Sequence, residues 1–308
     1  RTEAAVVVGK SGNDLTALRA LLEKGLSPSA LGDWLRCPLD FHFKRILRLK
    51  ESGEIGARIA DNVTGSALHA TMETIYRTQL GKPLEEALLS QAAEHVEQLL
   101  LAELAGVGVG AEMMRSGQPL LQLRMAIHAA RRFLRNEAKA VKNGAVITVL
   151  DLELDLSCKL SLAEEWIGSP VRILGRLDRV DRSNGRTRIL DLKTGKVDPA
   201  QLNVKELSLD GLKGEKRYAA QLLTYAWLYL TEHPEIDAVE AGVLPLQRAA
   251  SHEPLLLKVG GETQVQRTML PAIGRVLSEA VAEMMDPSVP VMHDPKSKYC
   301  RFCLKEES

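Results

Sequence analysis

The chain has 308 residues, of which 45% are hydrophobic, so it is long enough to bury a sizeable core. Its 40 Lys and Arg residues balance its 40 Asp and Glu residues, and this net charge gives no global sign of a nucleic-acid partner. No apolar run approaches the roughly 20 residues that a membrane helix needs, and no signal-peptide pattern opens the chain. Its four cysteines are too few for a secreted disulfide framework. We therefore expect a cytoplasmic protein without membrane contact.

The N-terminal stretch is predicted to hold two short helices. Residues 1–26 are expected to be a linker or tail, although residues 14–24 have the apolar spacing of a short amphipathic helix. A second helix should begin at Pro28, because Ser27 is a favourable N-cap and proline is favoured in the first turn. The main domain is therefore expected to span residues 27–308.

The next part of the chain is predicted to be helical. Residues 62–80 show apolar side chains at helical intervals, and His69 and Glu73 lie one turn apart on one face of this helix. Two longer helices, joined by the glycine-rich stretch AGVGVG, occupy most of residues 84–143. We interpret residues 84–143 as a helical insertion. By itself, a histidine on a helix is more often a packed or surface side chain than a metal ligand.

Residues 173–193 carry the strongest chemical signal and read as a β-hairpin. Two short apolar strands are joined by a Ser-Asn-Gly turn. Asp191 and Lys193 are two residues apart on the second strand, so they point to the same face of the sheet. Asp178 approaches from the first strand, so the hairpin is predicted to bring two carboxylates and an ammonium group together.

Two converging carboxylates favour a bound cation. Asp178 and Asp191 would repel and desolvate each other unless a cation lay between them. Oxygen ligands favour Mg²⁺ or Mn²⁺, a metal-bound water is a candidate nucleophile, and Lys193 could orient that water or stabilise charge on a phosphate. An isolated Asp-x-Lys is more often a solvated strand end, so this interpretation depends on the context of the motif.

The remaining elements predict an α/β fold. Strands are expected at residues 147–157, 238–246 and 254–259, and helices at residues 218–233 and 262–285. Gln221 and Tyr225 are one turn apart on the first of these helices, so they project together. We therefore expect a central mixed sheet that is flanked by helices and carries the site.

Four stretches in series resemble the PD-(D/E)XK nuclease superfamily, and in particular the exonuclease domain of RecB and AddB type. They are GSALHATME at 65–73, ILGRLDRVD at 173–181, ILDLKTG at 189–195 and QLLTY at 221–225. Each motif alone is weak, but the four follow the order of the family and are close to its spacing. The resemblance implies a restriction-endonuclease-like α/β core for residues 27–308.

The resemblance also implies roles for individual residues. The implied ligands of Mg²⁺ or Mn²⁺ are His69, Asp178, Asp191 and the backbone carbonyl of Leu192. Catalysis is implied for Lys193 together with Asp178 and Asp191. The implied accessory or DNA-binding residues are Gln221, Tyr225 and Glu73.

The activity implied by the resemblance is metal-dependent hydrolysis of DNA by an exonuclease of repair or recombination. Because the chain begins with Arg1 rather than Met, we expect a piece of a longer polypeptide with a helicase domain or subunit as its partner. A self-standing nuclease of repair or restriction type is the second interpretation. A non-catalytic DNA-binding scaffold is the third.

The cysteines suggest a second metal centre. Cys300 and Cys303 have the Cys-x2-Cys spacing of metal or iron–sulfur ligands, and Cys37 is a candidate third ligand. RecB-type domains with a [4Fe–4S] cluster carry a further cysteine after five more residues, but this chain ends at Ser308, one residue before that position. The sequence therefore predicts an iron–sulfur site whose fourth ligand is not in this chain, with the cysteine-bearing tail at about residues 293–308.

Overall fold

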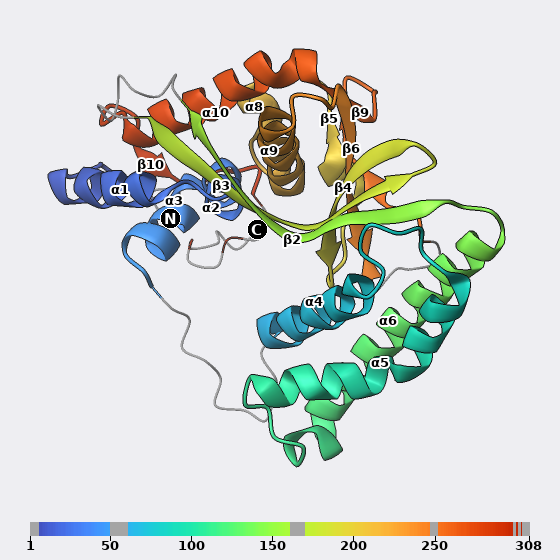
Figure 1. The fold of residues 1–308 in the computed structure, drawn as a ribbon. Coiled ribbons are helices and arrows are strands. Elements are labelled where there is room, and N and C mark those ends of the chain that lie inside the picture. The colour runs from blue at the N-terminus through green and yellow to red at the C-terminus, as the bar shows by residue number, and fades with distance from the viewer. Residues whose placement is uncertain are drawn as a thin grey trace.

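A computed structural model describes the following parts of the chain: residues 6–49, 61–160, 170–246, 252–297, 300 and 303. Its centre is a six-stranded mixed sheet in the order β2-β3-β4-β6-β7, in which β9 also pairs with β6 (Figure 1). The strands of this sheet are β2 (Ile147–Leu160), β3 (Val171–Ser183), β4 (Arg186–Lys193), β6 (Ala238–Pro245), β7 (Leu255–Leu256) and β9 (Gln264–Gln266). The predicted mixed sheet is therefore confirmed.

The predicted hairpin is formed by β3 and β4. These strands pair antiparallel, and the turn between them places Asn184 and Gly185 at φ values of 49° and 84°. Both values lie in the left-handed region that short hairpin turns require, and asparagine and glycine adopt it at the least cost. β4 then pairs in parallel with β6 on its other side. β4 is thus an interior strand, which accounts for its run of buried residues.

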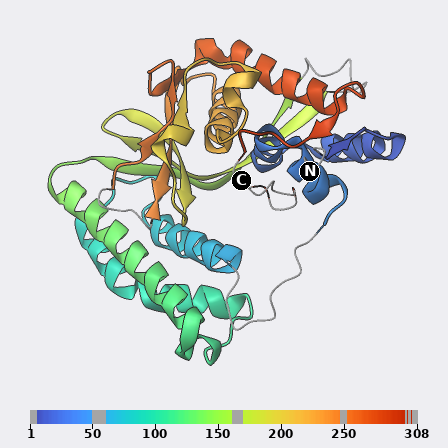
Figure 2. The same cartoon turned by 180° about the vertical axis from the view of Figure 1, so that it is seen from behind.

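Helices cover both faces of the sheet, as Figures 1 and 2 show. The long helices α4 (Asp61–Arg77), α5 (Glu86–Gly106) and α6 (Gly117–Lys142) pack together on one face, and α9 (Arg217–Glu232) and α10 (Leu270–Met285) lie on the other. Each face has its own apolar core. Successive side chains of β4 point to opposite faces of the sheet. Ile189 therefore packs in the core on the side of α9, and Leu190 packs in the core on the side of α4. None of the helices in the described ranges is long and apolar enough to cross a bilayer.

Shorter elements complete the described structure. The helices are α1 (Gly12–Lys24), α2 (Pro28–Arg36), α3 (Pro38–Phe41) and α8 (Leu209–Leu212), a π-helix (His42–Ile46), and the 3-10 turns Met113–Arg115, Pro199–Leu202 and Arg267–Met269. The strands are β1 (Val7–Val8), which pairs with β10 (Val291–Met292), and β5 (Asn203–Val204), which pairs with β8 (Lys258–Val259). Ser27 caps α2 and Pro28 starts it, as predicted.

Two sequence-based expectations are corrected. Residues 6–26 do not form a linker or tail, because α1 buries Leu18 and Leu22 in the main core. The helix predicted over 262–285 begins only at Leu270, since residues 264–266 pair with β6 as β9. In both places the stretch contains only a few apolar residues. Such a short pattern does not distinguish a helix from a strand, or a surface tail from a segment that packs in the core.

A buried network of charged side chains joins the helical layer to the sheet. Arg179 on β3 donates to Glu137 of α6 at 3.0 Å and to Asp181 at 2.8 Å. Arg188 on β4 also donates to Asp181, at 2.7 Å, and the hydroxyl of Tyr76 on α4 donates to Glu137 at 2.5 Å. Arg179 is 1% exposed, so these ion pairs are shielded from water. The network fixes α4 and α6 against the strands that carry Asp178 and Asp191.

Replacing Arg179 with methionine should therefore destabilise the fold. Arg179→Met leaves the buried carboxylate of Glu137 without its ion pair, and we expect the free energy of unfolding to fall by about 3 kcal/mol or more in urea titrations. The matched control is Arg176→Met on the same strand. Arg176 pairs with Asp155 at the surface, so its loss should cost less than about 1 kcal/mol. Equal stability of the two variants would show that the network is not a major link.

Candidate active site

The two predicted aspartates lie where β3 and β4 separate. The last paired residues of the hairpin are Arg179 and Leu190, and beyond them β3 pairs only with β2 and β4 only with β6. Asp178 and Asp191 are the first residues past this pair, so they lie at the mouth of the fork. The amide of Leu192, one residue further, donates a hydrogen bond of 2.6 Å to Asp178 Oδ2. The fork therefore brings the carboxylates together and also supplies a donor that holds one of them.

A histidine and a second carboxylate complete one side of the site. His69 on α4 lies with its Nδ1 atom 3.6 Å from Asp178 Oδ2. Glu153 on β2 contributes a further oxygen, and one ligand atom from each of these three residues lies within 4.8 Å of the other two. A small cavity of about 10 Å³ between α4 and the strands is lined by all three, which is room for a single water-sized sphere. Together, one imidazole and two carboxylates have the chemistry of a divalent-metal site.

Glu153 is the site residue that the sequence analysis missed. It lies between the paired residues Leu152–Arg179 and Leu154–Leu177 of β2 and β3, close to an irregularity in the pairing between Val149 and Asp151. Its backbone has a φ of 49°, an uncommon conformation for a residue other than glycine. In the sequence, Asp151, Glu153 and Asp155 alternate with leucines in the same way, so the pattern does not single out Glu153. The local irregularity of β2 sets it apart.

The other side of the site is built from β4 and α9. Lys193 Nζ lies 2.7 Å from Asp191 Oδ2, so the predicted shared face of these two residues is confirmed. The side-chain amide of Gln221 donates to Asp191 Oδ1 at 3.0 Å and contacts the hydroxyl of Tyr225 at 2.9 Å. The ammonium group of Lys193 also lies 5.6 Å from the ring centre of Tyr218. The predicted pair Gln221 and Tyr225 thus reaches the site, and Tyr218 joins it one turn earlier on α9.

A glycine on β3 allows α9 to come this close. A Cβ atom at Gly175 would lie 2.5 Å from a methyl carbon of Leu228 and 3.2 Å from the ring of Tyr225. Distances below 3.0 Å are not tolerated between such atoms, so any larger residue would displace the buried side chain of Leu228 or push α9 away from β3. Gly175 therefore sets the separation at which Gln221 reaches Asp191.

The electrostatics of the site favour a bound cation. Asp191 is 3% exposed, and burial raises its pKa to about 6. Burial also raises the pKa of Glu153, with a further contribution from the charge of Asp178. Burial lowers the pKa of His69 and of Lys193, but the neighbouring carboxylates outweigh this and raise both pKa values overall. Asp191 Oδ2 accepts no well-oriented hydrogen bond in the described structure, although Lys193 lies beside it. A divalent cation would satisfy this oxygen and relieve the repulsion, so these residues fit such an ion.

Three predicted ligands or accessory residues, Glu73, Asp191 and Leu192, lie outside the group of candidate metal-binding atoms. Glu73 lines the same small cavity, but its carboxylate forms an ion pair with Arg77 on α4 and is not among the grouped ligand atoms. Asp191 is also outside the group of His69, Glu153 and Asp178, because its carboxylate turns toward Lys193 and Gln221. The carbonyl of Leu192 stays a predicted ligand, and the structure shows only the hydrogen bond from its amide.

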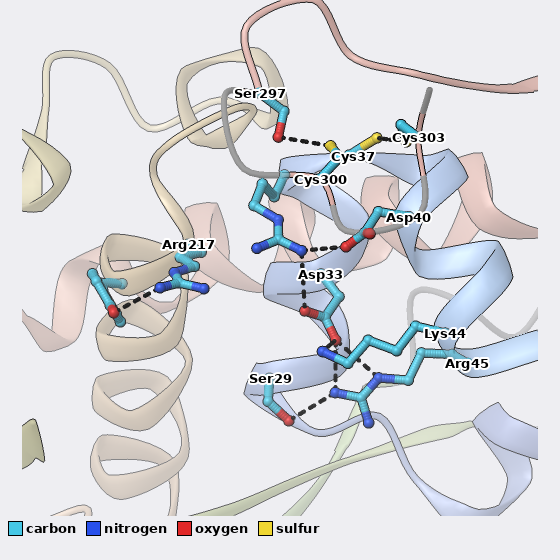
Figure 3. Close-up of polar contacts among 12 residues, drawn as sticks. Ser29, Asp33, Cys37, Asp40, Lys44, Arg45, Arg217, Ser297, Cys300 and Cys303 are labelled. Atoms are coloured by element: carbon cyan, nitrogen blue, oxygen red, sulfur yellow. Dashed lines mark hydrogen bonds and ion pairs between the residues drawn. The ribbon is translucent and has the colours of Figure 1, made fainter. Parts of the chain in front are cut away.

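The three predicted cysteine ligands also come together, although Cys37 is far from Cys300 and Cys303 in sequence. Cys37 Sγ lies 3.7 Å from Cys303 Sγ, and Cys300 belongs to the same group (Figure 3). The fourth member is His293, which the sequence analysis did not identify as a ligand. A hydrogen bond with Cys303 lowers the pKa of Cys37 to about 5. Backbone hydrogen bonds at Asp40 and Asp294 lower this pKa as well.

The fold and the site together define a class of protein. A mixed α/β sheet whose forked hairpin carries Asp178, Asp191 and Lys193 is a restriction-endonuclease-like nuclease fold. The sequence profile of the PD-(D/E)XK nuclease superfamily matches residues 25–306, and the chain belongs to this superfamily. A search of curated proteins gives no significant match.

The close packing at Gly175 can be tested by adding one methyl group. Gly175→Ala should lower the free energy of unfolding by about 1–3 kcal/mol, because the new Cβ collides with Leu228 and Tyr225. Gly110→Ala is the control, since nothing lies within 4 Å of a Cβ at that position. Urea unfolding of both variants measures the difference. If Gly175→Ala matches the control, the approach of α9 is not limited by this contact.

Proposed function

We propose that this protein is a Mg²⁺- or Mn²⁺-dependent deoxyribonuclease that hydrolyses the phosphodiester bonds of DNA. The observation that carries the proposal is the convergence of Asp178, Asp191 and Lys193 at the fork, with His69 beside them. They lie in the stretches that resemble the motifs of the superfamily to which the chain belongs. A merely solvated Asp-x-Lys would not bury the aspartate and direct a glutamine amide onto it.

His69, Glu153 and Asp178 would hold the metal, and Asp191 and the carbonyl of Leu192 would complete its protein ligands. When bound, the ion would supply Lewis acidity to the phosphate and lower the pKa of a bound water. Lys193 remains protonated, because the charge of Asp191 raises its pKa despite burial. Its ammonium group can therefore hydrogen-bond to the attacking water or to a phosphate oxygen. Asp191 and the ring of Tyr218 both lie close enough to stabilise that group in place.

The surface along α9 is suited to a nucleic-acid strand. A hollow of about 540 Å³ is lined by Gln221, Tyr225 and Arg176. A second hollow, of about 480 Å³, is lined by Tyr218, by four basic residues and by two acidic ones, which are Arg36, Lys196, Lys216 and Arg217 with Asp198 and Glu215. Tyr218, Gln221 and Tyr225 lie three or four residues apart, so they share the face of α9 that also contacts the site. Basic side chains beside the partly exposed ring of Tyr218 are a combination that can bind phosphates and unstacked bases.

We further propose that the protein acts as an exonuclease in repair or recombination, together with a helicase domain or subunit. Support for this comes from the likeness of its motifs to the RecB and AddB exonuclease domains. The test is digestion of end-labelled linear DNA and of circular DNA, single- and double-stranded, with Mg²⁺ or Mn²⁺. Loss of label from linear DNA with intact circles supports the exonuclease. Cleaved circles favour a self-standing endonuclease, and no digestion of either favours a DNA-binding scaffold.

Lys193→Ala should abolish DNA hydrolysis while leaving the fold intact. Loss of a group that stabilises transition-state charge costs a few kcal/mol, which is roughly a hundredfold or more in rate. Lys159→Ala is the matched control, because Lys159 is an exposed residue on β2 outside the site. Initial rates on the preferred DNA substrate, with circular dichroism as a check of folding, decide the outcome. A wild-type rate for Lys193→Ala contradicts the assignment of the site.

Glu153→Gln and His69→Gln should both weaken metal binding. Each removes one donor of the candidate metal group, so we expect Mn²⁺ to bind at least about tenfold more weakly to the purified protein. Asp155→Asn is the control, because Asp155 is an exposed carboxylate two residues further along β2. Calorimetric titration with Mn²⁺ measures the affinity without depending on turnover. If Glu153→Gln binds Mn²⁺ as tightly as Asp155→Asn does, Glu153 is not a ligand.

A further inference from the structure

Three thiols and one imidazole from distant parts of the chain meet outside the candidate active site. Cys37 lies between α2 and α3, and His293, Cys300 and Cys303 follow β10. The cysteines are 0%, 7% and 8% exposed, in this order. One atom from each of the four residues lies within 4.8 Å of the other three. We call this group the Cys3His cluster.

The distances within the Cys3His cluster match those around a single tetrahedral ion. Cys37 Sγ lies 3.7 Å from Cys303 Sγ and 3.4 Å from His293 Nδ1, and Cys300 Sγ lies 3.4 Å from the same nitrogen. Zinc binds sulfur at about 2.3 Å and nitrogen at about 2.0 Å, so a tetrahedral site has sulfur–sulfur edges of about 3.8 Å and sulfur–nitrogen edges of about 3.5 Å. The side chains are thus spaced as ligands of one ion would be.

Two other states of these cysteines fit the geometry less well. A disulfide has a sulfur–sulfur bond of about 2.05 Å, much shorter than the 3.7 Å between Cys37 and Cys303. In a [4Fe–4S] cluster each ligand binds a different iron, so the ligand atoms stand farther apart than the edges of a single-ion site. We propose that Cys37, His293, Cys300 and Cys303 bind one Zn²⁺ ion, with His293 as the fourth ligand.

The surroundings of the Cys3His cluster hold its ligands in place (Figure 3). Arg36, the residue before Cys37, forms an ion pair with Asp40, and Asp33 of the same helix accepts hydrogen bonds from Lys44 and Arg45. These contacts fix the backbone on both sides of Cys37. Ser297 lies with its hydroxyl 3.2 Å from Cys300 Sγ, within hydrogen-bonding distance of that ligand.

The cluster is also enclosed by apolar side chains. Leu39 and Val291 are buried against the cysteines, and Val8 and Phe43 pack on them. All four ligand positions come from the protein, which is the arrangement of a structural zinc site rather than a catalytic one. Such an ion would join residue 37 to residues 293–303, beside the pairing of β1 with β10. Zinc is therefore expected to fasten the C-terminal tail to α2 and α3 and to raise the melting temperature.

The test uses the full chain, freed of metal under reducing conditions and titrated with Co²⁺ and then Zn²⁺. Co²⁺ bound to thiolates shows sulfur-to-metal charge-transfer absorption, which distinguishes the Cys3His cluster from the candidate active site with its oxygen and imidazole ligands. We expect one thiolate-bound Co²⁺ per chain, displaced by one Zn²⁺. His293→Asn should weaken binding about a hundredfold or more, because even residues behind the ligands contribute 10–100-fold. The controls are His128→Asn, at an exposed histidine of α6, and Cys158→Ala, at a cysteine of β2, which should both bind like the wild type.

A second variant keeps the test decisive if His293→Asn folds poorly. His293→Cys should still bind one ion, with a cobalt spectrum shifted to that of an all-thiolate site. Anaerobic reconstitution with iron and sulfide tests the alternative, an iron–sulfur cluster. A stable cluster of four irons whose spectrum is the same in wild type and His293→Asn would overturn the proposal, as would the absence of thiolate-bound Co²⁺. Neither result depends on nuclease activity, so the proposed function stands or falls separately.

Discussion

The candidate active site depends on the point at which β3 and β4 stop pairing. Up to Arg179 and Leu190 the two strands form one ladder, and one residue later their backbones diverge to different neighbours. Asp178 and Arg179 both line the small cavity beside α4. Arg179 is held in the buried network by Glu137 of α6. The last residue pair of the hairpin, Arg179 and Leu190, is therefore fixed against the helical layer. The carboxylate next to it is thereby held at the mouth of the fork.

Helix α9 is the second element on which the site depends, and its position is limited from two sides. Gly175 lets it approach β3, and α2 also packs against it. Because Tyr218, Gln221 and Tyr225 all project from one face of α9, a shift of this helix would displace all three together. Residues far from the carboxylates can therefore alter the site by moving one rigid element.

Much of this arrangement follows from local sequence patterns. The hairpin, the shared face of Asp191 and Lys193, and the pair on α9 could be predicted, because each depends only on strand or helix periodicity. Glu153 and His293 could not. The position of Glu153 depends on an irregular backbone in β2 that its neighbours in sequence do not share, and His293 becomes a candidate ligand only once residues separated by more than 250 positions are brought together. The core role of α1 was hidden for the same reason, since its partners are distant in sequence.

The pairing of the two ends of the described chain also bears on how the protein folds as it is synthesised. Within the described chain, β1 and Cys37 are synthesised long before their partners, which are β10 for the strand and His293, Cys300 and Cys303 for the thiol. The hairpin and α9 are made well before those partners. A nascent chain can therefore assemble the fork while the segment from β1 to Cys37 still exposes unpaired backbone and a free thiol. During this interval that segment, rather than the fork, is the part of the protein that calls for protection by chaperones and by a reducing environment.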